Sequence, residues 1–321
     1  MEKILSCDWG TSSFRLRLVQ PGTQTIVQEL STTQGIAATH KQWQNEGNKD
    51  NRIAFYRSVM ETHIKALEEQ LGEALTGLPI VFSGMISSSV GMIELPYKEL
   101  PFLADGSDLL VTKIEALPDF PHDLVIISGA TTGKDVLRGE ETLLAGCGII
   151  KTNTEQLFIF PGTHSKHIRV KNGWAKDFKT YMTGEVFDLL SNKSILAGAV
   201  EKDPVELPAS GNSHFDEGIH EGAAANLLNS FFNVRTSQLF NKRKPKENYH
   251  YLSGLLIGAE LKSIAEKPPA SITLVCDEKI KNSYCRGLQL LRLNSDILTW
   301  KNAAETLVSG QLKICSGLFI L

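Results

Sequence analysis

The chain reads Asp8-Trp9-Gly10-Thr11-Ser12-Ser13-Phe14-Arg15-Leu16-Arg17 near its beginning, and its second half echoes this stretch with Phe160-Pro161-Gly162-Thr163-His164-Ser165-Lys166-His167-Ile168-Arg169. Gly-Thr, a serine two residues after the threonine, and the last arginine occupy the same offsets in both copies. Each copy follows an apolar run and leads into alternating residues, which predicts two strands joined by a tight turn. A turn of glycine and hydroxyl residues offers backbone N–H and O–H donors to an anion. Two copies predict two jaws that close on one polyphosphate, as in a kinase or an ATPase.

The elements predicted around the two turns also repeat. The first half reads as strands at 3–7, 14–19 and 25–30, a helix at 53–71, strands at 78–83 and 124–128, and a helix at 140–150, with an irregular region at 84–122. The second half reads as strands at 157–161, 166–171 and 174–181, helices at 217–233 and 252–266, a strand at 272–276, and helices at 281–293 and 302–317. We therefore predict a duplicated α/β fold with lobes at 1–150 and 151–321.

The composition argues against several classes of function. A net charge of −3 and the lack of a long basic run argue against a nucleic-acid-binding face. No uncharged apolar run approaches the ~20 residues that a membrane-spanning helix needs. The five cysteines are scattered without Cys-x-x-Cys spacing, so they read as reduced residues, mostly of the core. We expect a cytoplasmic protein that binds neither nucleic acid nor a membrane.

An aspartate marks the first turn and is missing from the second. Asp8 ends an apolar strand, where it either holds Mg²⁺ through water or caps the turn, and the duplicated phosphate turn favours the magnesium role. Phe160 takes its place in the second copy, whose turn adds His164 and Lys166. Lys166 is a candidate to offset charge on a transferred phosphoryl group, and His164 is either a phosphate donor or a structural residue.

Three further segments are candidates for the remaining groups. The Gly129-to-Asp135 stretch fails as a P-loop because three residues, not four, separate its glycines. Asp135, Arg138, Glu140 and Glu141 lie at or just after its end. The acids offer a general base and Arg138 can bind a substrate carboxylate with two N–H groups; alternatively, the acids only interact favourably with the dipole at a helix start. Gly84-to-Gly91 is either a hydroxyl-recognition loop or a plain serine-rich loop. Ser253-Gly254 at a predicted helix start suits either adenosine or close helix packing.

Seven segments occur in one order: Asp8-Trp9-Gly10-Thr11-Ser12, Gly84-Met85-Ile86, Glu94-Leu95-Pro96-Tyr97, Asp135-Val136-Leu137-Arg138-Gly139-Glu140-Glu141-Thr142, Pro161-Gly162-Thr163-His164-Ser165-Lys166, Met182-Thr183-Gly184-Glu185 and Leu252-Ser253-Gly254-Leu255-Leu256-Ile257-Gly258. Together they resemble the 2-dehydro-3-deoxygalactonokinase (2-oxo-3-deoxygalactonate kinase) family over nearly the whole chain. The resemblance implies a duplicated actin-like (ribonuclease H-like) ATPase fold, with the active site in the cleft between two lobes. It also implies ATP-dependent phosphorylation of 2-dehydro-3-deoxy-D-galactonate at its 6-hydroxyl, in galactonate catabolism. One departure concerns the substrate: the family often carries Gly-Ser-Arg/Asn-Gln-Gly where this chain has Ser87-Ser88-Ser89-Val90-Gly91.

The motifs and the resemblance together define an expected site for ATP, Mg²⁺ and a small sugar acid. Asp8 holds the metal, Glu140 or Asp135 is the base, and Lys166 is the third catalytic candidate. The expected ATP- and phosphate-binding residues are Gly10, Thr11, Ser12, Gly162, Thr163, His164, Ser165, Ser253 and Gly254. The expected substrate-binding residues are Gly84, Met85, Ile86, Ser87, Ser88, Tyr97 and Arg138. A homodimer is one possible assembly of this chain.

Three alternatives remain at this stage. One is a kinase for another 2-keto-3-deoxy sugar acid, and a second is a nucleotide or polyphosphate hydrolase. The third is a non-catalytic sugar-acid sensor on the same fold. The sequence counts against the sensor, because it carries no visible helix-turn-helix segment and both phosphate turns are intact.

Overall fold

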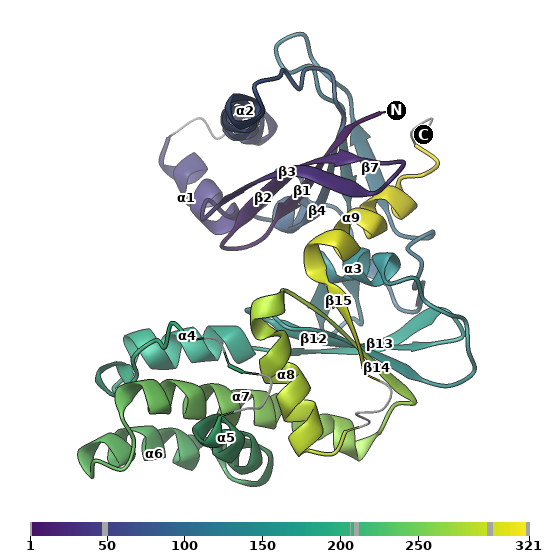
Figure 1. The fold of residues 1–321 in the computed structure, drawn as a ribbon. Coiled ribbons are helices and arrows are strands. Elements are labelled where there is room, and N and C mark those ends of the chain that lie inside the picture. The colour runs from purple at the N-terminus through teal and green to yellow at the C-terminus, as the bar shows by residue number, and fades with distance from the viewer. Residues whose placement is uncertain (1, 47–50, 206, 209–211, 294–297, 319–321) are drawn as a thin grey trace. The chain divides into compact units, whose positions relative to one another are not determined.

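The computed structural model describes residues 2–46, 51–205, 207–208, 212–293 and 298–318, and the chain divides into two compact units (Figure 1). Unit 1 comprises Met1–Lys151, Gly173–Asp177 and Ala303–Leu321, and unit 2 comprises Thr152–Asn172 and Phe178–Asn302. The first boundary falls beside the polar linker that follows residue 150. Two later segments, however, leave the second half of the sequence and join unit 1.

Unit 1 is built on a six-stranded sheet in the order β3-β2-β1-β4-β8-β7. Its strands are β1 (Ile4–Trp9), β2 (Phe14–Gln20), β3 (Thr25–Thr32), β4 (Ile80–Gly84), β7 (Val111–Ile114) and β8 (Leu124–Ile127). β1, β4 and β8 run parallel, whereas β2 and β3 form an antiparallel meander on one side of β1. Three short strands, β5 (Lys98–Glu99), β9 (Ala130–Thr131) and β10 (Val136–Leu137), form a separate small sheet. β6 (Phe102–Leu103) pairs with the start of β13 (Trp174–Tyr181), whose residues up to Asp177 belong to unit 1.

Helices α1 (Ile36–Asn45) and α2 (Arg52–Leu71) belong to the same unit as this sheet. The helix predicted at 53–71 is confirmed as α2, and Asn51 caps it by accepting a hydrogen bond from the Ala54 N–H at 3.1 Å. Its apolar stripe, Tyr56, Met60, Ile64 and Leu67, lies in the core with the buried side chains of the strands. A one-sided stripe of this kind fixes a helix on a sheet because it removes apolar area from water.

Unit 2 repeats the topology of unit 1. Its strands are β11 (Gln156–Phe160), β12 (Ser165–Lys171), β13 (Trp174–Tyr181), β14 (Ser271–Cys276) and β15 (Leu298–Asn302). The order β13-β12-β11-β14-β15 has the same ranks as β3-β2-β1-β4-β8, and β11, β14 and β15 again run parallel. Asn172-Gly173 joins the strands predicted at 166–171 and 174–181, and its positive φ values of 55° and 76° are those of a tight two-residue turn. The predicted duplication is therefore confirmed.

The helices of unit 2 gather around α7 (Pro245–Glu266), which packs against α4 (Thr183–Lys193), α5 (Ser213–Ala224), α6 (Leu227–Leu239) and α8 (Glu278–Leu290) (Figure 1). The single helix predicted at 217–233 is wrong, because α5 and α6 replace it. Ala225 is extended between them, and Asn226 caps α6 by accepting from the Leu228 N–H at 3.1 Å. Helix α4 has no counterpart in the prediction. In the described part of the chain, no helix combines the length and apolar character needed to cross a membrane.

Helix α7 begins at Pro245, well before the predicted start at 252. Ser253 and Gly254 therefore lie inside the helix, so the prediction that adenosine rests on a helix N-terminus at these two residues is wrong. The alternative, close helix packing, is what the structure has. A Cβ at Gly254 would come within 2.2 Å of the Phe215 carbonyl oxygen of α5, and one at Gly222 within 2.0 Å of the Leu255 carbonyl oxygen of α7. The two helices touch backbone to backbone.

The C-terminal helix α9 (Ala303–Ile314), predicted in the second lobe, belongs to unit 1, where it packs on α3 (Glu140–Gly146). A Cβ at Gly310 would come within 1.9 Å of the Thr142 carbonyl oxygen. The buried Gln311 donates to the Cys7 carbonyl at 3.1 Å and to the Ser83 hydroxyl at 2.9 Å, which ties α9 to β1 and β4. Helix α3 ends at Gly146, four residues short of its predicted end at 150.

Replacing Gly254 by alanine should destabilise the protein, although alanine normally favours a helix. The added methyl would collide with the α5 backbone, and forcing the helices apart should cost about 2–3 kcal/mol of unfolding free energy. Urea unfolding of Gly254→Ala and of Gly198→Ala measures the difference, because a Cβ at Gly198 meets nothing within 4 Å. The control should be neutral or slightly stabilised. Equal stability of the two variants would contradict backbone contact between α5 and α7.

Candidate active site

The first Gly-Thr turn links β1 to β2 and rests on the beginning of α1. The Gly10 N–H donates to the Ser13 carbonyl at 2.9 Å, which closes the turn, and Thr11 and Ser12 are exposed. The Ile36 N–H donates to the Gly10 carbonyl at 2.9 Å, and the Ala37 N–H donates to the Thr11 carbonyl at 3.1 Å. Helix N–H groups thus satisfy the turn's carbonyl oxygens. The positive end of the helix dipole lies against the turn, where it favours an anion.

The second Gly-Thr turn has the same support. Gly162 and Thr163 are exposed between β11 and β12, and the Glu185 N–H at the start of α4 donates to the Thr163 carbonyl at 3.0 Å. Gly184 lies so close to the turn that a Cβ there would come within 2.6 Å of the Gly162 carbonyl oxygen. In both units, therefore, a helix beginning binds the carbonyl side of the turn. This arrangement leaves exposed glycine and hydroxyl residues for a phosphate.

Asp8 stands at the end of β1, beside the first turn. Its Oδ2 accepts from Arg15 Nη1 at 3.0 Å, and its side chain is 24% exposed. Its Oδ1 faces Gly84 at the end of β4, where a Cβ would lie 3.3 Å away. A partly exposed carboxylate at a strand end, next to a phosphate-type turn, is a place where a hydrated ion could be held. Mg²⁺ suits such a site, because it keeps much of its water and needs only one or two carboxylates. Among the described residues, no group of three or more His, Cys, Asp or Glu could hold a metal.

Glu140, one of the two candidate bases, begins α3 next to Asp8 and Gly84. Its helix starts after Gly139, whose φ of 109° only glycine adopts readily, and whose Cα approaches Gly84 so closely that a Cβ would lie 3.5 Å from the Gly84 Cα. Glu140 Oε2 accepts from the Arg138 N–H at 3.1 Å. The backbone therefore brings the start of α3 to the strand ends that carry Asp8 and Gly84.

Asp135, the rival candidate, lies in the hairpin turn between β9 and β10. Its N–H donates to the Thr132 hydroxyl at 2.9 Å, and its Oδ1 accepts from the Val136 N–H at 2.8 Å. The Asp135 carbonyl accepts from the Thr131 hydroxyl at 2.9 Å. These bonds are those of an aspartate that shapes a turn.

Glu141 follows Glu140 but points into the core, where it is 1% exposed. Its two carboxylate oxygens accept from the Gly139 N–H at 2.9 and 2.8 Å, and Oε1 also accepts from the Thr142 hydroxyl at 3.0 Å. Burial, with the nearby charge of Glu140, raises the pKa of Glu141 to about 7. Glu141 thereby holds the glycine that turns the chain into α3.

Arg138 was expected to clamp a substrate carboxylate, but in the structure its guanidinium braces a loop. Nε donates to the Tyr97 hydroxyl at 3.0 Å, Nη1 to the Ser87 hydroxyl at 2.6 Å and also to the Ser87 carbonyl, and Nη2 to the Leu95 carbonyl at 3.3 Å. The guanidinium also lies 4.1 Å from the Tyr97 ring centroid. Arg138 thus joins residues 87–97 to the start of α3, and most of its donors are engaged within the protein.

The serine-rich loop after β4 is likewise bonded internally. Ile86 is in the hydrophobic core, and the hydroxyls of Ser87 and Ser88 donate to the Gly84 and Met85 carbonyls at 3.4 and 2.7 Å. These three residues were expected to contact the substrate, yet they are buried and shape the loop. Gly84 is buried as well, whereas Met85 and Tyr97 are partly exposed.

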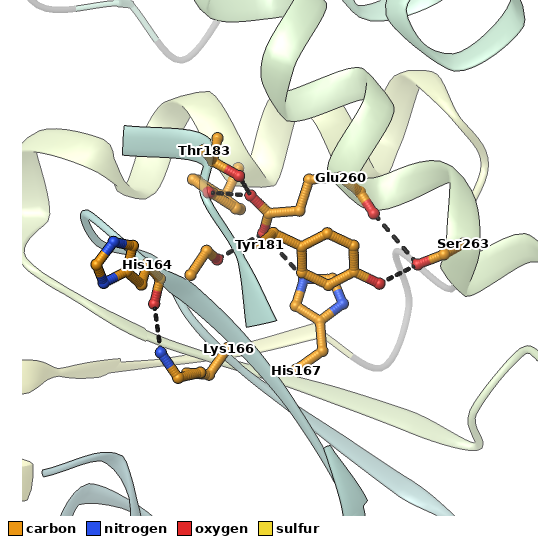
Figure 2. A network of polar contacts seen from close by, with 9 residues as sticks. His164, Lys166, His167, Tyr181, Thr183, Glu260 and Ser263 are labelled. Carbon is orange, nitrogen blue, oxygen red and sulfur yellow. Dashed lines mark hydrogen bonds and ion pairs between the residues drawn. The ribbon is translucent and has the colours of Figure 1, made fainter. Parts of the chain in front are cut away.

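A buried carboxylate network lies behind the second turn (Figure 2). Ser165, expected among the phosphate ligands, is fully buried, and its hydroxyl donates to Glu260 of α7 at 2.6 Å. That prediction is wrong for the hydroxyl group, because β12 turns Ser165 toward α7. His164 Nε2 contacts Glu185 Oε2 at 2.5 Å, and Lys166 Nζ donates to the His164 carbonyl at 3.0 Å. Lys166 is 6% exposed, so its charged group is buried against the backbone of the turn.

Sequence reasoning missed the residues that support the turns. It gave no role to Gly35, where a Cβ would come within 2.4 Å of the Thr11 carbonyl oxygen, or to Gly184, although Gly184 stands in one of the quoted family segments. It gave no role to Glu260 either. A signal was available for Glu260, since its apolar neighbours Leu256, Ile257, Leu261 and Ile264 put it on the buried part of α7.

The Glu141→Gln variant should differ from the wild type in how its stability depends on pH. A buried acid with a raised pKa contributes most stability when protonated, and that contribution is lost as the pH rises from 4.5 to about 7. The wild type should therefore lose about 2–3 kcal/mol relative to the variant between pH 5 and pH 8. Urea unfolding at both pH values measures this difference, and parallel pH dependence of the two proteins would contradict it.

Comparisons with known proteins agree with these features. A model of the 2-keto-3-deoxy-galactonokinase family matches residues 8–312. DgoK1 of Rhizobium meliloti (strain 1021), named as a probable 2-dehydro-3-deoxygalactonokinase, is 31% identical over 264 residues, which cover 79% of this chain and 78% of the relative. The 2-dehydro-3-deoxygalactonokinase of Escherichia coli (strain K12) is 32% identical over 224 residues, covering 66% and 71%.

Two solved structures share the fold. The crystal structure of a putative 2-dehydro-3-deoxygalactonokinase from Sinorhizobium meliloti superposes with a TM-score of 0.81 at 26% identity and covers 99% of this chain and 97% of its own. The activator of 2-hydroxyisocaproyl-CoA dehydratase from Clostridium difficile has a TM-score of 0.50 at 10% identity and covers 98% and 95%. The fold is the duplicated α/β fold of actin-like ATPases and sugar kinases, and the chain belongs to the 2-keto-3-deoxy-galactonokinase family.

Proposed function

We propose that the protein transfers the γ-phosphoryl group of ATP to the 6-hydroxyl of 2-dehydro-3-deoxy-D-galactonate, a step of galactonate breakdown. The observation that carries this proposal is the pair of exposed Gly-Thr turns, each with its carbonyl side bound by a helix beginning. Each turn, taken by itself, offers exposed glycine and hydroxyl groups to a phosphate. Family membership and the names of the two curated relatives supply the substrate.

The two turns would have unequal tasks. Gly162 and Thr163 would bind nucleotide phosphates through backbone N–H groups, and Lys166 would add positive charge beneath them. Gly10, Thr11 and Ser12 would meet the transferred phosphoryl group beside Asp8. Asp8 would hold Mg²⁺ together with water and phosphate oxygens, and the ion would offset negative charge that develops in the transition state.

Glu140 is the base in this proposal. Its helix starts beside Gly84 and Asp8, whereas the carboxylate of Asp135 is bonded into a hairpin turn. The sugar hydroxyl would give its proton to Glu140 while its oxygen attacks the γ-phosphorus. The bond from phosphorus to the bridging oxygen of ADP would then break.

The loop at 84–97 would form the wall of the sugar-acid site. We revise the proposed role of Arg138 from a carboxylate clamp to the brace of this loop, since Ser87, Leu95 and Tyr97 receive its hydrogen bonds. A rigid loop can orient an acceptor hydroxyl within attacking distance, and such positioning supplies much of the rate in phosphoryl transfer.

A screen of ATP consumption across 2-keto-3-deoxy sugar acids and plain aldonates tests the function. We expect 2-dehydro-3-deoxy-D-galactonate to exceed the other acceptors by about 10- to 100-fold in kcat/KM, because each mispositioned hydroxyl costs transition-state contacts. Phosphorus NMR should find the product phosphorylated at carbon 6. Phosphate release without an acceptor would instead indicate a hydrolase, and a preference for another sugar acid would replace the proposed substrate.

Single-turnover assays of Glu140→Gln and Asp135→Asn separate the two candidate bases. The proposal predicts that Glu140→Gln lowers the rate of phosphoryl transfer by about 10²–10⁴, because the amide cannot accept a proton. Asp135→Asn should stay within about tenfold of the wild type, since its effect is confined to a turn. The reverse ranking would make Asp135 the base.

A further inference from the structure

Glu260 is a carboxylate in the interior of unit 2 that no step above uses. It lies on α7, is 2% exposed and accepts four hydrogen bonds (Figure 2). Its Oε1 accepts from the Ser165 hydroxyl at 2.6 Å and from His167 Nε2 at 2.9 Å. Its Oε2 accepts from the Thr183 hydroxyl at 2.5 Å and from the Tyr284 hydroxyl at 2.8 Å. Burying a carboxylate is costly, so four donors on one group indicate a site that the fold is built to satisfy.

The four donors come from the elements that surround the second phosphate turn. Ser165 follows the turn directly, and His167 lies two residues further along β12. Thr183 begins α4, next to Gly184 and Glu185, which contact the Gly162 and Thr163 carbonyls. Tyr284 fixes the carboxylate from α8. One acid therefore connects the strand that leaves the turn with the helix beginning that supports it.

We propose that Glu260 is a positioning residue for nucleotide binding, because it holds the two supports of the phosphate turn in fixed relation. This inference rests on the proposed function only in taking the turn as the site of the nucleotide phosphates. The hydroxyls of Ser165 and Thr183 are directed at Glu260, so the donors proposed for the phosphates are the turn's backbone N–H groups. The directions of these N–H groups depend on where Ser165 and Thr183 hold the backbone.

The carboxylate chemistry matters for this role. An ionised carboxylate has about four acceptor positions and no donor, which matches the four donors that surround it. Burial alone would raise the pKa of Glu260, but the hydrogen bonds from His167, Ser165 and Thr183 outweigh burial and hold the pKa below its usual value. A glutamine in its place has one accepting oxygen and a donating NH₂ group. Two of the surrounding groups would then have to reorient.

Calorimetric titration with Mg-ADP, without any sugar acid, tests the proposal directly. The Glu260→Gln variant should bind ADP about tenfold more weakly or worse, and its KM for ATP should rise by a similar factor. Its KM for the sugar acid should stay within twofold. A purely structural role would instead lower the fraction of active protein, so that kcat and the binding stoichiometry fall while Kd and both KM values are unchanged. That result, or an unchanged ADP affinity, would overturn the proposal.

Glu221→Gln is the matched control. Glu221 also accepts hydrogen bonds within unit 2, from the Tyr251 hydroxyl at 2.6 Å and Asn233 Nδ2 at 3.1 Å, but its partners do not adjoin the phosphate turn. Its ADP affinity should match the wild type, and a loss equal to that of Glu260→Gln would overturn the specific role of Glu260.

Tyr284→Phe is the second variant, in case Glu260→Gln does not fold. It removes one donor and keeps the ring, so ADP affinity should fall a few-fold, and an unchanged affinity would overturn the proposal. Failure of the proposed function is distinguishable. If the wild type binds ADP but phosphorylates no sugar acid, the substrate assignment fails and the role of Glu260 stands or falls on ADP affinity. If the wild type does not bind ADP, both proposals are overturned.

Discussion

The close approach of a helix beginning to each Gly-Thr turn is the constraint on which the site depends. A Cβ at Gly35 would lie 2.4 Å from the Thr11 carbonyl oxygen, and a Cβ at Gly184 would lie 2.6 Å from that of Gly162. Because both positions lack a side chain, helix N–H groups reach the turn's carbonyls in both units. The carbonyls would otherwise repel an anion or compete for its donors. Engagement of these carbonyls by the helices is what would let a tight turn accept a phosphate.

Local sequence patterns predicted the parts of the fold that local physics decides. The strands around both turns alternate or run apolar, the hairpin at Asn172-Gly173 has its required residues, and Asn51, a residue type that favours helix starts, caps α2. Errors arose where tertiary packing decides. The break between α5 and α6 depends on one capping residue, Asn226, within an otherwise helical pattern. A glycine such as Gly254 looks the same in the sequence whether it begins a helix or lies where two helices cross. Only the packing against α5 distinguishes the two cases.

The sequence predicted the local positions of the candidate site residues better than it predicted their bonding partners. Asp8, Glu140 and the two turns lie at strand ends and helix starts, which are common positions for functional residues in α/β folds. The bonding partners of Arg138 and Ser165 come from distant segments, and those partners decide what each side chain has left to offer. Arg138 meets Ser87, which is 51 positions away, and Ser165 meets Glu260, which is 95 positions away. A hydroxyl or a guanidinium already engaged within the protein organises the site instead of contacting the ligand.

The two copies of the turn differ in the charged residues that lie beside them. The first copy keeps Asp8 and lies near Glu140, so its unit carries negative groups suited to a metal ion and a proton. The second copy has Phe160 at the equivalent place and Lys166 beneath the turn, so its unit presents donors and positive charge. Glu260, a buried acid of this unit, is surrounded by four donors. An unsatisfied acid at that place would repel a polyphosphate, because a buried charge is weakly screened. In the proposed function, the duplication supplied two anion sites; the carboxylates beside the first copy would make it the site of chemistry, and the second copy would bind the nucleotide phosphates.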